Sequence, residues 1–420
     1  MRKVKHLVPL LLVLLTNLIG FGVLYFTNRG IDNTILYCSV AVAAIVLISY
    51  AIILFASLGD EYLFLIVSMI FTIGIMFLLR SNTEIAMHQT MFFYVGMAGF
   101  FIVYVIYKKT NVFHTLKYSM AFIIVSVALF MFTLVFGSSI GGAKNWLSFG
   151  KIGIQPSEII KIFFIMSLAG LLTYEADDDN STLLKRIMNN NTKRQFFIMA
   201  VAFMFMGFLI LQREWGSALL YFLIYFTMQY IFGSSKTVLF LTLLFAAGGS
   251  YLGVKTMTHI QQRITIWMDP FKNASDLGYQ IVQSLYAMAS GGVTGSGLGL
   301  GYPSYIPLYT NDFIFAAICE ELGMIGGVGV MLLFFMLVYR GIKIALRSTN
   351  VYNKAVATGI SAMFGYQTFI IIGGVTKFIP LTGITLPFVS AGGSSLAACF
   401  AALAILQAIS AKTEEVSDVI

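Results

Sequence analysis

The amino-acid sequence predicts an all-α protein, a polytopic membrane bundle of about twelve transmembrane helices. The first observation is the composition, because 59% of the 420 residues are hydrophobic and only 10% are charged, whereas charged residues make up about a quarter of a soluble domain. The second is a mean hydropathy of +0.88. The third is that apolar runs of about 17 to 25 residues, enough to cross a bilayer, recur along the chain. Together these observations exclude a water-soluble fold.

The twelve expected spans follow the chain in order. They cover residues 7–26, 35–56, 61–79, 91–107, 117–137, 157–173, 195–211, 216–233, 237–255, 313–340, 354–374 and 385–408. Residues 1–6 are basic and precede the first span without a small-residue cleavage site, so we expect a retained helix and not a removed signal peptide. The long polar connection between the ninth and tenth spans predicts a large extracellular loop.

The basic residues predict the orientation. A cytoplasmic N-terminus places sixteen of the 26 Lys and Arg residues inside, as the positive-inside rule requires. Both termini are then cytoplasmic, and the net charge of +8 indicates topology and no nucleic-acid partner. We expect Gln155, Arg213 and Thr310 on the outer side and Asn190 on the inner side.

Four outer segments carry polar residues that differ from their apolar surroundings. They read GGAKNWLSFGKIGIQPSEIIK at 141–161, QREWGS at 212–217, QRITIWMDPFKNASDLGYQIVQSLYAMASGGVTGSGLGLG at 262–301 and GITLPFVSAGGSS at 383–395. Long loops are where binding and catalytic residues concentrate. We interpret the glycines of 292–301 as tight turns in a re-entrant or flexible cap.

Asp312 is the candidate for chemistry, since it lies where an apolar helix begins and ionisable groups at a membrane are costly and usually functional. Asp is also among the best N-cap residues, so capping and catalysis stay open as alternatives. Glu320 and Glu321 lie further along the same helix, and for them we expect a structural role with hydrogen bonds.

Taken together and in this order, these segments resemble the SEDS family (shape, elongation, division and sporulation), whose members include RodA, FtsW and SpoVE. The resemblance covers about residues 61–410 and rests on QPSE-x-x-K, Q-x-acid-x-G-[ST], GYQ-x-x-QSL, DFIFA-x-x-x-EE-x-G and LPF-x-S-x-GGSS. It implies a core of about ten helices. We therefore interpret residues 1–60 as an added pair of helices and residues 411–420 as a cytoplasmic tail.

Family members are peptidoglycan glycosyltransferases that polymerise lipid II outside the cytoplasmic membrane with a class B penicillin-binding protein. The resemblance implies the same activity here, with lipid II, the growing glycan strand, membrane lipid and that transpeptidase as partners. Asp312 matches the family's essential aspartate and is the expected general base. The residues expected to bind substrate, taken from the matching motifs, are Glu158, Lys161, Arg263, Lys144, Trp146, Gln212, Arg213, Gln280, Gln283, Ser394 and Ser395.

The sequence departs from the family pattern at Asn145, where Arg is usual, and at Arg213, where Pro is usual. These changes leave open which cations stabilise the leaving diphosphate. We favour Lys161 and Arg263 by their place in the motifs, although Lys161 and Glu158 could also pair as a structural bridge. No cofactor is required by the motifs, and a divalent cation, Mg²⁺ or Mn²⁺, stays open as another source of positive charge.

Two other classes of function remain as alternatives. A transporter that flips lipid II would suit a bundle with broken helices, but the distinctive polar residues cluster on one side and form no chain through the membrane. A non-catalytic scaffold of the elongation, division or sporulation machinery is the other, because the sequence departs from the family pattern near Asp312. Polymerisation of purified lipid II discriminates among the three.

Overall fold

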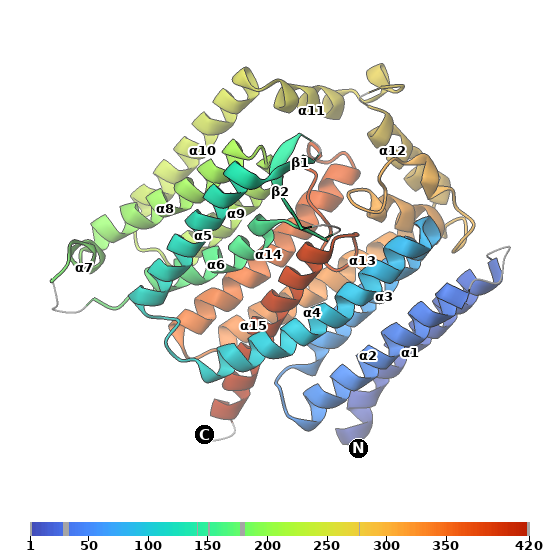
Figure 1. The fold of residues 1–420 in the computed structure, drawn as a ribbon, viewed down its shortest axis with the longest axis horizontal. Coiled ribbons are helices and arrows are strands. Elements are labelled where there is room, and N and C mark those ends of the chain that lie inside the picture. Colours follow the sequence, from blue (N-terminus) through green and yellow to red (C-terminus); the bar gives the residue numbers. More distant parts are fainter. Residues whose placement is uncertain are drawn as a thin grey trace.

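A computed structural model describes residues 2–27, 33–140, 142–149, 152–176, 181–276 and 278–417. Long helices lie side by side in one bundle (Figure 1), as the predicted all-α class requires. The helices are α1 (Arg2–Thr27), α2 (Asn33–Phe55), α3 (Glu61–Ser81), α4 (Thr83–Lys109), α5 (Leu116–Phe136), α6 (Pro156–Leu172), α7 (Leu183–Asn189), α8 (Asn191–Leu211), α9 (Trp215–Phe232), α10 (Lys236–Thr256), α11 (Thr258–Met268), α12 (Tyr279–Gly291), α13 (Ile314–Arg347), α14 (Val351–Val375) and α15 (Gly393–Ser417).

Eleven of these helices, counted over the described residues, are long and apolar enough to cross a membrane. The chain is therefore a multi-pass membrane protein. The remaining predicted span forms as α6, which begins with Pro156 at a first-turn position and has 17 residues, fewer than the other spans. The count of twelve stays a prediction, although α1 begins and α15 ends at the same end of the bundle (Figure 1), as an even number of crossings requires.

The opposite end of the bundle carries the short elements that helical periodicity did not predict. Strands β1 (Ser138–Ile140), β2 (Ala143–Phe149) and β3 (Ile152–Ile154) form an antiparallel sheet in that order. Helices α11 and α12 lie at this end as well (Figure 1). The outer segments 138–154 and 258–305 thus contain folded elements over their described residues and are not open loops.

Helix α13 is broken at Gly323, whose φ of 68° and ψ of −171° are not helical. The backbone of the glycine-rich segment 292–302 supplies the missing partners, with four N–H···O bonds of 2.9 to 3.2 Å. They run from Met324 to Gly292, from Ile325 to Val293, from Ser296 to Glu320 and from Gly297 to Glu321. Unpaired backbone groups are costly at membrane depth, so the two segments depend on each other.

The acids of α13 have the structural role that the sequence predicts. One carboxylate oxygen of Glu320 accepts the amide of Tyr302, and one of Glu321 accepts the amide of Gly299, both at 2.8 Å. Arg80 of α3 lies 3.5 Å from the other oxygen of Glu321. Positive φ angles at Gly292, Gly295, Gly297 and Gly299 confirm the predicted tight turns, because only glycine adopts them without strain.

The last predicted span is wrong at its start. Residues 385–392 are not helical, and α15 begins at Gly393. Pro387 lacks the backbone N–H that a helix interior needs, and Phe388 has a φ of +63°, far from the helical region. Residues 376–392 instead form an irregular connection, called here the α14–α15 loop, which reaches the candidate site.

The first two helices pack onto the rest of the bundle. Helix α1 contacts α3, and α2 contacts α3 and α4. One face of the pair is buried, with Phe21 at 2% and Val42 at 0% exposure, while Leu18 is 70% exposed. An apolar outer face of this kind is what lipid contact requires, so the pair extends the bundle sideways.

Candidate active site

Asp312 lies in the connection between the short helix η2 (Pro303–Tyr305) and α13. Its side chain does not cap α13, because the N-cap residue is Phe313 and no side chain bonds the first turn. Within the described part of the chain, no group donates a hydrogen bond to the Asp312 carboxylate. The capping alternative is therefore wrong, and the carboxylate oxygens are available to a substrate.

Arg263 of α11 faces the same point as Asp312. A Cβ atom on Gly383 would stand 3.6 Å from Oδ2 of Asp312 and 3.6 Å from Nη2 of Arg263. Burial raises the pKa of Asp312 to about 6, and the positive charge of Arg263 opposes that rise. A carboxyl whose pKa approaches neutrality is a better general base than an ordinary aspartate, provided that it is deprotonated at the working pH.

The α14–α15 loop holds both members of this pair. The guanidinium of Arg263 donates from Nη1 to the carbonyls of Leu381 at 3.1 Å and Thr382 at 2.7 Å. The hydroxyl of Ser390 donates to the carbonyl of Asn311, the residue before the acid. Because one loop fixes the cation and the chain next to the carboxylate, their relative position is set by a single element.

Glu158 and Lys161 form the predicted pair, deep in the bundle. They are 8% and 3% exposed, and Lys161 Nζ donates to Glu158 Oε2 and to Gln367 Oε1, both at 3.0 Å. Ser395 donates to the same oxygen of Glu158 at 3.2 Å and contacts the Thr385 hydroxyl at 2.9 Å. The charges are thus paired and hydrogen-bonded, as buried charges must be.

The two clusters are joined by the α14–α15 loop. The side-chain amide of Gln367 donates to the carbonyl of Thr385 at 2.9 Å, two residues beyond Gly383, which faces the acid and the arginine. The structure therefore brings Asp312 and Arg263 together and, separately, Glu158, Lys161 and Ser395.

Three predicted residues meet at the small sheet. The amide of Lys144 donates to the carbonyl of Gln212 at 3.2 Å, and the Gln212 side chain donates to the carbonyl of Phe130 at 3.3 Å. The ring of Trp146 covers Gly153, where a Cβ would stand 3.0 Å from it. These contacts position β2 against α5 and the end of α8.

The other predicted residues make contacts elsewhere than at Asp312. Arg213 is exposed and has a φ of 63°, Gln280 of α12 donates to the carbonyl of Pro307 at 3.4 Å, and Gln283 is half-buried on the same helix. Ser394 accepts the amide before α6 at 3.4 Å. The structure gives none of them a contact with Asp312.

Glu214 is a buried acid that the sequence analysis did not select. Its Oε1 accepts hydrogen bonds from Gln155 at 3.0 Å and Ser157 at 3.2 Å, and it is 6% exposed. Burial raises its pKa, and hydrogen bonds to neighbouring side chains oppose that rise. The only sequence feature that could have identified Glu214 is an acid inside the QREWGS segment. For Gln367 it is a single amide in an apolar helix, and neither feature is specific without knowledge of the contacts.

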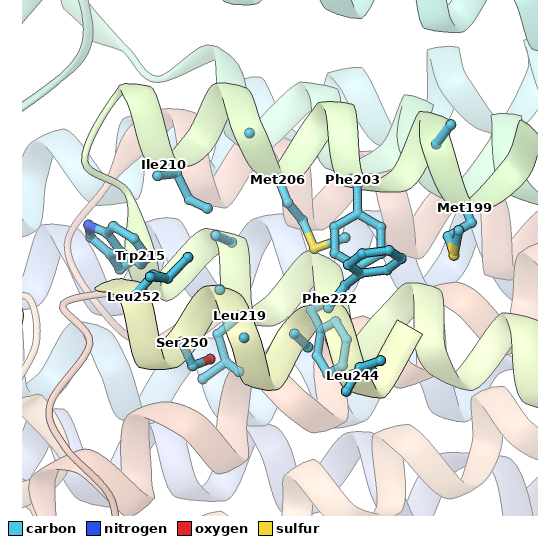
Figure 2. Close-up of a pocket in the computed structure, with 17 residues that line it drawn as sticks. Met199, Phe203, Met206, Ile210, Trp215, Leu219, Phe222, Leu244, Ser250 and Leu252 are labelled. Carbon is cyan, nitrogen blue, oxygen red and sulfur yellow. The ribbon is translucent and has the colours of Figure 1, made fainter. Parts of the chain in front are cut away.

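An apolar cavity of about 770 Å³ lies between α8, α9 and α10. Figure 2 shows Phe203 and Met206 of α8 facing Phe222 of α9 and Leu244 of α10 across it, with Trp215 at one end. Volumes of this size suit a ligand and not a few waters. The lining is aliphatic and aromatic, so the cavity fits a hydrocarbon chain.

The described residues hold no group of three or more His, Cys, Asp or Glu side chains that could bind a metal ion. Mg²⁺ is often held by one or two carboxylates and substrate phosphates, but the acid here faces a guanidinium. A divalent cation stays a prediction that the polymerisation assay with EDTA or Mg²⁺ tests, and among the described residues Arg263 places positive charge beside Asp312.

Two named proteins are similar to this chain in sequence. Peptidoglycan glycosyltransferase RodA of Mycobacterium tuberculosis (strain ATCC 25618 / H37Rv) is 34% identical over 272 residues, which cover 64% of this chain and 58% of that protein. Stage V sporulation protein E of Bacillus subtilis (strain 168) is 36% identical over 293 residues, covering 68% of this chain and 77% of that protein. The chain thus spans less than two thirds of the RodA relative.

A solved structure of a peptidoglycan synthase complex that coordinates polymerization and crosslinking has the same fold, with a TM-score of 0.67 at 23% identity over 84% of this chain and 98% of that chain. The profile of the FtsW/RodA/SpoVE family, described as cell cycle proteins, matches residues 47–415. The match begins inside α2, so the proposed boundary at residue 60 stays a prediction. The chain belongs to the FtsW/RodA/SpoVE family, the SEDS family that its motifs resemble.

Proposed function

We propose that this protein is a peptidoglycan glycosyltransferase that polymerises lipid II on the outer face of a bacterial cytoplasmic membrane. The observation that carries the proposal is the carboxylate of Asp312, which does not cap α13 and is buried beside Arg263. Among the described residues, no group donates a hydrogen bond to it. The names of the relatives support the reaction class. A buried acid without a structural partner costs stability and is typical of a site that works on a substrate.

The reaction is a single displacement. Asp312 takes the proton from the 4-hydroxyl of the acceptor sugar, and the resulting oxygen attacks the anomeric carbon of the donor sugar. The bond from that carbon to the diphosphate breaks, and the electron pair leaves with the polyprenyl diphosphate. Arg263 stabilises the negative charge that develops there. Attack from the opposite face inverts the anomeric centre, and no residue forms a covalent intermediate.

The cavity between α8, α9 and α10 is the proposed place for the polyprenyl chain. Its lining is apolar, and Trp215 at its end begins α9, directly after the QRE of the QREWGS segment. A chain bound there leaves its diphosphate at the end of the bundle that carries α11, on which Arg263 lies. The glycan strand and membrane lipid are the other expected ligands.

A class B penicillin-binding protein is the proposed protein partner. The solved complex of similar fold couples polymerization to crosslinking, and a transpeptidase is the class of enzyme that crosslinks new strands. Co-purification with the transpeptidase of the same cell, and its effect on the polymerisation rate, test this part of the proposal.

Polymerisation of purified lipid II tests the function. We expect glycan strands, and a rate that rises with pH until about pH 6 and then levels, because Asp312, with a pKa of about 6, works only when deprotonated. Below that pH the rate falls about tenfold per unit. The assay is run with and without the transpeptidase, and with EDTA or Mg²⁺. Flipping of lipid II without polymer would favour the transporter, and binding alone would favour the scaffold.

The orientation has its own test, cysteine substitution followed by an impermeant thiol reagent. The sequence analysis expects Thr310 to be reachable, but it is only 8% exposed, so the neighbouring Leu308, 69% exposed, replaces it. We expect Leu308→Cys and Arg213→Cys to react from outside and Asn190→Cys only after lysis. Labelling in the reverse sense would place Asp312 in the cytoplasm and end the proposal.

A further inference from the structure

Two ring nitrogens without partners lie near each other at the end of the apolar cavity. Trp215, the first residue of α9, lines that end, and Figure 2 shows its indole nitrogen turned away from the other lining side chains. His259 of α11 lies beside it, with ring centroids 6.1 Å apart. The Nε1 of Trp215 and the Nε2 of His259 are both buried and have no hydrogen-bond partner within the described residues.

Positive charge surrounds this ring pair. Arg263 lies one helical turn after His259 on α11, on the same face. Arg213 lies two residues before Trp215. Burial lowers the pKa of His259, and the charges of Arg263 and Arg213 lower it further, so both arginines act on the imidazole electrostatically.

A third unpartnered group belongs to the same place. The Thr382 hydroxyl is buried without a partner among the described residues, and a Cβ on Gly216, the residue after Trp215, would stand 2.9 Å from Thr382 Cβ. The carbonyl of Thr382 accepts a hydrogen bond from Arg263. A buried polar group without a partner costs about 1–3 kcal/mol. Three such groups near Arg263 therefore indicate a site for an anionic ligand.

The cavity narrows the choice of anion. An apolar space of about 770 Å³ that ends at N–H donors and arginines fits an amphiphile with a long hydrocarbon chain and a small, highly charged head. A diphosphate presents more acceptor oxygens and more charge than a phosphodiester, so it matches two guanidinium groups and two N–H donors better. An inorganic anion would not fill the apolar cavity, because it has no hydrocarbon chain.

We infer that Trp215 and His259 bind the diphosphate oxygens of a polyprenyl diphosphate whose hydrocarbon chain fills the cavity between α8, α9 and α10. The inference rests on the proposed function and deepens it, because it names the residues at which the chain ends and the head group begins. The pair touches the phosphate group and not the reacting hydroxyl. It therefore governs substrate affinity and product release, while Asp312 governs proton transfer.

The three tryptophans of the sequence provide a direct assay. Trp146→Phe with Trp267→Phe leaves Trp215 as the only indole in the full-length protein. Undecaprenyl diphosphate, added in detergent micelles, is expected to change the Trp215 emission with a saturable curve. Undecaprenol, which lacks phosphate, phosphatidylglycerol, which carries one phosphodiester, and inorganic pyrophosphate are the other probes. We expect each to bind at least tenfold more weakly.

His259→Ala is expected to weaken undecaprenyl diphosphate binding at least tenfold, and His259→Gln, which keeps an N–H donor, to recover part of the loss. Lys272→Gln, an exposed charge of the same outer segment, is the matched control and should bind normally. In the polymerisation assay, His259→Ala should raise KM with little change in kcat. Melting curves show whether each variant is folded, and calorimetric titration of the unmodified chain replaces fluorescence if the double Phe protein unfolds.

If undecaprenol or phosphatidylglycerol binds as tightly as undecaprenyl diphosphate, the inference is overturned, because the site would then not recognise the diphosphate. Unchanged binding by folded His259→Ala would overturn it as well. Failure of the proposed function looks different, because a chain that binds undecaprenyl diphosphate through His259 but makes no glycan loses the reaction and keeps the binding site.

Discussion

Asp312→Asn is expected to abolish glycan polymerisation while the protein still folds and inserts. The amide keeps the shape of the carboxylate but cannot accept the proton of the sugar hydroxyl. A general base contributes about 10² to 10⁴ in rate, or roughly 3 to 5 kcal/mol of barrier. Asp276→Asn, an exposed acid of the same outer segment, is the control and should polymerise normally. Near-normal activity of Asp312→Asn would remove this residue from the mechanism.

Stability distinguishes loss of the base from loss of the fold. The pKa of Asp312 is raised from 3.8 to about 6 in the folded protein, so the folded state binds this proton more tightly than the unfolded state does. The free energy of unfolding therefore falls as pH rises from 3.8 to about 6. Asp312→Asn removes this pH-dependent decrease in the free energy of unfolding, because the amide does not titrate. We expect the variant to melt at the same or a higher temperature than the parent at pH 7.5, in detergent.

Exchanging Glu158 and Lys161 has the second large effect. Either single change, Glu158→Lys or Lys161→Glu, leaves two like charges in the buried cluster and is expected to cost at least the ~3–5 kcal/mol of a broken buried pair. The double change restores opposite charges. It also places a carboxylate against Gln367 Oε1, which now accepts from Lys161 at 3.0 Å. We expect the double variant to recover part of the stability and not all of it.

Activity separates two roles for Lys161. Lys161 is 3% exposed and its ammonium group is bonded to Glu158 and Gln367, which favours scaffolding over the predicted contact with the diphosphate. If it is scaffolding, polymerisation recovers in step with the melting temperature across all four proteins of the cycle. If the ammonium also meets the diphosphate, the double variant recovers stability and stays inactive. Lys117→Glu, an exposed charge reversal, controls for charge alone.

The sequence predicts the helical bundle well because each membrane-spanning helix requires a run of about 20 apolar residues, which is easy to recognise. Spans such as 61–79 and 195–211 correspond to α3 and α8 within a few residues. The same reasoning placed a helix over 385–392, where the segment is just as apolar but Pro387 and a positive φ at Phe388 prevent it. Hydropathy measures burial and cannot tell a buried loop from a buried helix.

The candidate site was only partly predictable, for a different reason. Asp312, Glu158 and Lys161 stand in short motifs that resemble the family, so the sequence alone selected them. Gln367 and Glu214 matter through contacts across 206 and 57–59 positions of chain, and no local pattern encodes such partners. The capping alternative for Asp312 was equally local, and only the position of Phe313 at the N-cap decided against it.

The break in α13 limits the routes by which a substrate can reach Asp312. Segment 292–302 shares four backbone bonds with the broken helix, and unpaired groups there would cost several kcal/mol each. It therefore cannot swing open as a flap on each catalytic cycle. Under the proposed function, the lipid then enters sideways from the bilayer through the cavity between α8, α9 and α10, and the spent carrier leaves by the same route. Under the same proposal only the sugar chain moves into water, so we expect turnover to slow in a stiffer bilayer even when the chemistry is unchanged.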